Sequence, residues 1–284
     1  MLLAQCIVIG IVNGCIYILA ALGWMIVFNV TRVLNFTQGE FVMLGGMLAA
    51  TAVAMGISPP IAFLIAILVT TVMGCIVERA VINQLRNAPD TTLMIATIGA
   101  SLSMRIGALM IWGWEPRDLA PFTRGKPIFF FGAPIVPQAF WVMGATLLLV
   151  AGLFCFYKYS LLGKALTATS IDQEAARLMG INPGKMSMIA FALASALGAM
   201  GGILVAPIIM TSFDTGVMIS VKALVAAVIG GFKPKGVLIV ALTIGLIENI
   251  VAGFISSGWR DIFSLTIMVF ILVILIPRLV SVKA

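Results

Sequence analysis

The chain of 284 residues contains no histidine and few charged side chains. Histidine is the commonest metal ligand and the usual acid–base catalyst near neutral pH, so its absence argues against a metal site and against most enzymes. The four cysteines stand singly within apolar segments, without the spacing of a disulfide framework or a zinc site. Charged residues make up 10% of the chain, against about 25% in a typical soluble domain. This composition predicts no metal and no cofactor on this chain.

Long apolar runs fill most of the sequence, which is 62% apolar with a mean hydropathy of +1.20. A helix needs about 20 apolar residues to cross about 30 Å of hydrocarbon. The runs therefore predict an all-α polytopic membrane protein, with residues 1–284 as a single transmembrane domain. We expect spans near residues 3–29, 39–57, 59–79, 91–113, 138–157, 186–209, 217–232, 236–256 and 262–277. The second and seventh are short or rich in glycine and are either broken, re-entrant or simple crossings, so eight and nine spans are both open.

The net charge of +7 is scattered between the apolar runs and forms no basic face. This pattern argues against a nucleic-acid partner and matches the loop charges that orient proteins among membrane lipids. With the N-terminus outside, only Arg117, Arg124, Lys126 and Arg260 of the loop charges fall on the outer side. The positive-inside rule therefore predicts an outside N-terminus and a cytoplasmic C-terminus.

The longest external connection runs from about 114 to 137. Its five prolines exclude a continuous helix, and the apolar run at 129–131 predicts a short strand or hairpin on the outer rim. The connection either receives a substrate-delivery protein or serves as a plain connector.

A polar island at about 158–185 lies between apolar runs on the predicted cytoplasmic side. We expect Ser170 and Gln173 to form a capping box that starts a helix over 171–179. Asp172 and Glu174 suit its first turn, where the helix dipole favours negative charge. Gly180 fits the left-handed position past its end. A helix this short is marginal in water and needs a docking partner to persist.

One face of this predicted helix is apolar, with Ile171, Ala175, Leu178 and Met179 at helical spacing. The face either inserts into a groove on a soluble partner or lies flat on the bilayer. The absence of bulky aromatic residues and of a basic stripe favours the partner.

Ionisable residues inside a membrane are costly and mark ion pairs or polar paths. Lys222 and Glu248 fall near mid-membrane on consecutive spans, so we expect them to pair beside the path, although direct contact with a charged solute is the alternative. Arg105 either meets a substrate carboxylate, snorkels to the outer headgroups or pairs with a neighbouring chain. Asn13, Gln38 and Glu40 are further path candidates, or hold helices together. The small-residue faces Gly10–Gly14 and Gly198–Gly202–Ala206 predict close helix packing, within the chain or with a neighbouring chain.

Several motifs resemble one family of membrane proteins. Glu174, Ala175, Ala176 and Gly180 match the E-A-A-x-x-x-G pattern with which bacterial ABC importer permeases contact their ATPases. The segments GKALTATSIDQEAARLMGI at 163–181, RVLNFTQGEF at 32–41, KALVAAVIGG at 222–231 and GLIEN at 245–249 are similar to permeases for branched-chain amino acids. Asn13-Gly14, Tyr17 and Ala21-Leu22-Gly23 match the start of that family. The resemblance covers nearly the whole chain in order.

The resemblance implies an inner-membrane permease subunit of an ATP-driven importer in bacteria. Such a subunit pairs with a second, homologous permease, with two cytoplasmic ATPases that bind ATP and magnesium, and with a periplasmic substrate-binding protein. The coupling contacts would be Asp172, Glu174, Ala175, Ala176, Arg177, Gly180 and Ile181. Relatives are thought to carry urea, short amides or aromatic acids, and Gln38 stands where a histidine is common. The rival class is a stand-alone secondary transporter or channel.

Overall fold

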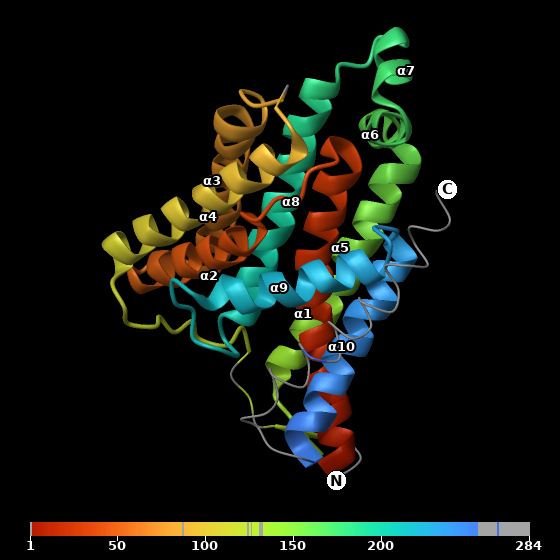
Figure 1. Ribbon diagram of the computed structural model, residues 1–284. Coiled ribbons are helices and arrows are strands. Elements are labelled where there is room, and N and C mark those ends of the chain that lie inside the picture. The colour runs from red at the N-terminus through yellow and green to blue at the C-terminus, as the bar shows by residue number, and fades with distance from the viewer. Residues whose placement is uncertain are drawn as a thin grey trace.

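A computed structural model of the chain describes residues 2–86, 88–123, 125, 127–130, 133–254 and 266. Helices dominate it, as the apolar runs predict (Figure 1). In chain order they are α1 (Leu2–Thr31), α2 (Gln38–Ala54), α3 (Pro59–Val77), the π-helical turn η1 (Glu78–Ile82), α4 (Asp90–Trp112), α5 (Pro137–Tyr159), α6 (Leu161–Ile171), α7 (Gln173–Leu178), α8 (Pro183–Val205), α9 (Thr215–Ile229) and α10 (Pro234–Phe254).

Six of the described helices are long and apolar enough to cross a membrane: α1, α3 with η1, α4, α5, α8 and α10. The prediction of an all-α polytopic membrane protein is therefore confirmed. The two spans that the sequence marks as short, 39–57 and 217–232, correspond to the shorter apolar helices α2 and α9. In Figure 1 both run roughly from side to side, whereas α1, α5 and α8 run roughly from top to bottom. The span predicted at 262–277 lies outside the described residues, apart from residue 266.

α1 forms the centre of the bundle, with α8, α9 and α10 packed around it (Figure 1). Small residues allow these contacts, because a side chain on Gly14 would lie 2.9 Å from the Cα atom of Leu242 in α10. Gly202 of α8 packs in the same way on the carbonyl of Val42 in α2. The predicted close packing thus occurs within the chain, so these small-residue faces are occupied and are not open to a second permease.

The two ends of the bundle carry different structures. A hairpin of β1 (Ile128–Phe130) and β2 (Ala133–Ile135) pairs antiparallel beside the N-terminal part of α1, which confirms the hairpin predicted in this connection. α6 and α7 lie at the opposite end of the molecule from the N-terminus (Figure 1). The polar island and the hairpin therefore lie at opposite ends of the bundle.

Candidate functional site

The polar island folds as two short helices instead of the single helix predicted over 171–179. α6 ends at Ile171, Asp172 is extended with a φ of −149°, and α7 spans six residues. The predicted capping box of Ser170 and Gln173 is wrong. Asp172 caps α7 instead: its carboxylate accepts hydrogen bonds from the amides of Glu174 (2.8 Å) and Ala175 (3.1 Å). An extended aspartate supplies the acceptor that the first turn needs, so Ser170 is left inside α6.

The end of α7 follows the prediction. Gly180 has a φ of +82°, the left-handed conformation that glycine adopts most readily. The amide of Ile181 then donates to the carbonyl of Ala176 at 3.0 Å. Asn182 caps α8 by accepting from the amides of Gly184 and Lys185, at 3.0 and 3.3 Å.

α7 and the residues on either side of it expose large apolar side chains at this end of the molecule. Leu178 is 89% exposed, Met179 83% and Ile171 77%. Ala176 faces the other way and is buried, so it anchors α7 to its own chain and is not available to a partner. Asp172, Glu174, Ala175, Arg177 and Gly180 are exposed, and Ile181 is half-buried. The result is a projecting apolar surface (Ile171, Leu178 and Met179) with a charged rim.

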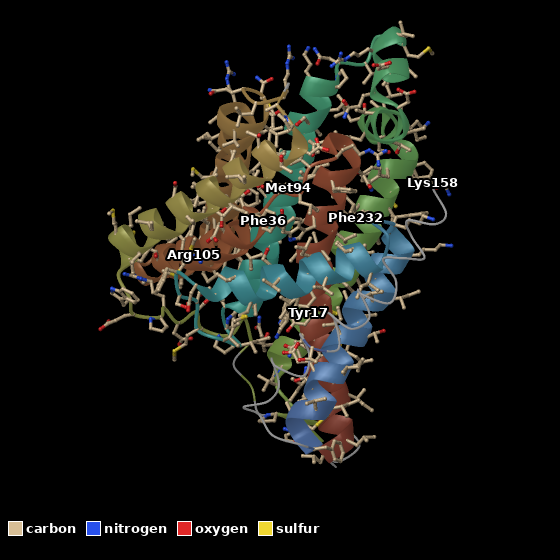
Figure 2. All side chains as sticks on the ribbon, in the orientation of Figure 1. Tyr17, Phe36, Met94, Arg105, Lys158 and Phe232 are labelled. Atoms are coloured by element: carbon tan, nitrogen blue, oxygen red, sulfur yellow. The ribbon has the colours of Figure 1, made fainter. Side chains whose placement is uncertain are left out.

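A second cluster surrounds the start of α2 inside the bundle. The guanidinium of Arg105 in α4 lies 2.8 Å from the Glu40 carboxylate, and the Ser101 hydroxyl donates to the same oxygen at 2.8 Å. The Gln38 amide donates to the carbonyl of Ala194 in α8 at 3.0 Å. Glu40 neutralises the charge of Arg105, so Arg105 neither snorkels to the headgroups nor needs a partner on a neighbouring chain. Arg105 is labelled in Figure 2, at the edge of the bundle.

The turn from α1 into α2 is also polar and buried, which reasoning from the sequence missed. The Asn35 side chain accepts from the amide and the hydroxyl of Thr37, at 3.2 and 2.7 Å. Thr97 of α4 donates to the Leu34 carbonyl and accepts from the Phe36 amide. A run of polar residues between two apolar segments was the available signal, since such residues inside a membrane need internal partners.

The Lys222–Glu248 pair is confirmed. The lysine ammonium lies 2.8 Å from the carboxylate, and both side chains are buried. Tyr17, at the centre of the bundle in Figure 2, donates its hydroxyl to the other carboxylate oxygen at 2.7 Å. The three residues join α1, α9 and α10. Asn13, one turn before Tyr17, lines a cavity of about 290 Å³ together with Gln5 and Ile135.

These clusters bind helices together instead of performing covalent chemistry. In these clusters Glu40 pairs with the half-buried Arg105 and Glu248 with the buried Lys222, which removes most of the cost of holding these charges in hydrocarbon. Across the described ranges, no group of three or more His, Cys, Asp or Glu residues could hold a metal ion.

The structure is that of a polytopic membrane protein, with long apolar helices, shorter apolar helices between them and two ion pairs inside the bundle. The family model for the branched-chain amino acid transport system permease component matches residues 6–272, and the chain belongs to that family.

Individual proteins similar to this chain are also transport permeases. The high-affinity branched-chain amino acid transport system permease protein LivH of Salmonella typhimurium is 27% identical over 281 residues, covering 94% of this chain and 91% of the relative. The fructose import permease protein FruF of Bifidobacterium longum is 25% identical, over 94% and 76%. The fold resembles an inward-facing conformation of a putative metal-chelate type ABC transporter, with a TM-score of 0.55 and 15% identity over 97% of this chain and 85% of that one.

Proposed function

We propose that the chain is the inner-membrane permease subunit of an ATP-binding cassette importer. Its partners are a second, homologous permease, two cytoplasmic ATPases that carry ATP and magnesium, and a periplasmic substrate-binding protein. The N-terminus is periplasmic and the C-terminus cytoplasmic. Family membership supports this assignment, and the projecting apolar surface of α7 is the observation that carries it.

ATPase docking explains why α7 exposes its apolar side chains. Leu178 and Met179 lie at the end opposite the N-terminus, beside the charged residues Glu174 and Arg177. A short helix that presents apolar side chains with a charged rim suits a groove on a soluble partner. Closure of the ATPases on ATP would push α7, and the spans would then rock between outward-open and inward-open states.

The proposed solute is a branched-chain amino acid or a related small polar molecule. The two intramembrane ion pairs balance their own charges, so they offer no unpaired charge to a charged solute. Zwitterionic or neutral solutes are compatible with ion pairs that are already neutralised. The relatives are named for amino acids and for sugars. Uptake of labelled leucine, with fructose, urea and phenylalanine as competitors, separates the solute classes.

Mutation of α7 tests the docking. The double variant Leu178→Glu/Met179→Glu, purified from native membranes in mild detergent, should lose the ATPase that accompanies the unmodified chain. A matched control is Met55→Glu, because Met55 is also exposed (75%) but follows α2 at a different turn of the chain. An unmodified chain that purifies alone, or a double variant that keeps its ATPase, would refute the proposal.

The rival, a stand-alone secondary transporter or channel, drew its support from charges inside the membrane. Glu40 pairs with Arg105, and Lys222 pairs with Glu248. Both pairs are accounted for as links between helices. The rival also leaves the exposed surface of α7 without a role.

A further inference from the structure

The first turn of α7 is tied to the end of α1. The Gln173 side chain donates its amide to the carbonyl of Val30 at 2.7 Å, across 143 residues of sequence. Val30 lies in the last turn of α1, where the final four carbonyls have no partner within the helix. Gln173 therefore caps α1 from another part of the chain.

Arg32 makes the reverse connection. Its guanidinium donates to the carbonyl of Ser170 at 2.5 Å, and Ser170 lies in the last turn of α6. A cation at a helix C-terminus also meets the negative end of the helix dipole. Gln173 of α7 thus caps α1, and Arg32, directly after α1, caps α6; these two contacts, Gln173 with the Val30 carbonyl and Arg32 with the Ser170 carbonyl, form a clasp.

The backbone at Arg32 indicates that its side chain matters. Its φ is +62°, a left-handed conformation that glycine usually supplies just past a helix end. A non-glycine residue held there is strained, and such strain concentrates at functional positions. The guanidinium is what a glycine would lack.

The chain beyond the clasp is locked into the bundle. Val33, Asn35 and Gln38 are buried, and Thr97 of α4 bonds to the backbone on both sides of Asn35. Glu40, two residues after Gln38, pairs with Arg105 of α4. A displacement at Arg32 therefore moves a closely held turn and not a loose loop.

We propose that Gln173 and Arg32 are positioning residues that pass the movement of α7 to the turn at 32–37 and from there to α2 and α4. This inference rests on the proposed function, because the movement comes from an ATPase docked on α7. The clasp joins α7 and the end of α6 to the end of α1, next to the turn that leads into α2, in addition to the covalent connections of α7 to α6 and α8.

Two variants remove the clasp without removing the fold. Gln173→Met keeps the length and the helix propensity of the side chain and deletes the donor. Arg32→Gly deletes the guanidinium and suits the left-handed backbone. The controls Gln84→Met and Arg86→Gly make the same changes at exposed positions between η1 and α4.

The readout is hydrogen–deuterium exchange of the complex with its ATPase, with and without ATP and vanadate, so that no solute needs to be known. In the unmodified complex we expect nucleotide to change exchange both in 173–180 and in 32–40. In Gln173→Met/Arg32→Gly the change should persist in 173–180 and be lost in 32–40. The single variant Arg32→Lys keeps a cationic donor in a chain that still has Gln173. It should therefore retain part of the nucleotide response in 32–40.

A response in 32–40 that survives in the double variant, or that is absent from the unmodified complex, would overturn the inference. Release of the ATPase by the double variant would also overturn it, since the clasp would then serve docking. An unmodified chain without any ATPase would instead refute the proposed function, and the inference with it.

Discussion

Removing one partner of the buried Lys222–Glu248 pair should destabilise the protein severely, whereas removing both should not. At an effective dielectric of about 20, unit charges 2.8 Å apart attract each other by about 6 kcal/mol. Much of that attraction offsets desolvation, and deleting one partner of a buried pair costs about 3–5 kcal/mol because the other charge is left alone. Glu248→Gln leaves Lys222 in this position, buried between α1 and α10.

The assay is the midpoint of thermal aggregation in detergent, followed by size-exclusion chromatography. At about 2–4 °C per kcal/mol, Glu248→Gln should lower the midpoint by about 10 °C. The double variant Lys222→Met/Glu248→Gln keeps an acceptor for Tyr17 and should recover most of this loss. Lys233→Met, at an exposed lysine, is the control and should change little. A Glu248→Gln variant as stable as the unmodified chain, or a double variant no better than the single one, would refute the reasoning.

Three further predictions follow from individual contacts. Arg105→Met should lower the aggregation midpoint more than Glu40→Gln/Arg105→Met does, because the single change strands a buried carboxylate; equal losses would contradict this. Gly202→Val should abolish folded protein in chromatography, because its side chain would meet the Val42 carbonyl, whereas Gly201→Ala, with 3.6 Å to the nearest atom, should be tolerated; similar yields from both would count against the packing. Asp172→Ala should weaken α7 by about 1 kcal/mol and raise exchange of its amides, while unchanged exchange would argue against the cap.

The features that were predicted correctly depend on residues close together in the sequence or on simple properties of single segments. Long apolar runs indicated the spanning helices, and two shorter runs indicated α2 and α9. Lys222 and Glu248 lie at similar depths on consecutive helices, so their pairing followed from the cost of isolated charge. Gly180 needs only its own backbone preference to occupy the left-handed position at the end of α7.

Features that depend on chain reversal were not predictable in the same way. The reversal after α1 occurs at Arg32, and an arginine gives no warning of a left-handed conformation. The contacts of Glu40 with Arg105 and of Gln173 with Val30 join residues 65 and 143 positions apart, so no local pattern in the sequence indicates them. The break at Asp172 was missed for a related reason: Ser170 satisfied a local capping pattern, while the structure uses the extended aspartate.

The central claim is that α7 is the surface on which an ATP-hydrolysing partner docks. The most direct test places a photo-crosslinking amino acid at position 178, which is 89% exposed, and irradiates native membranes. We expect one dominant adduct from position 178, whose mass spectrum identifies an ATPase subunit, and no such adduct from position 55 on another turn. Adducts with lipid alone, or the same ATPase adduct from both positions, would contradict it.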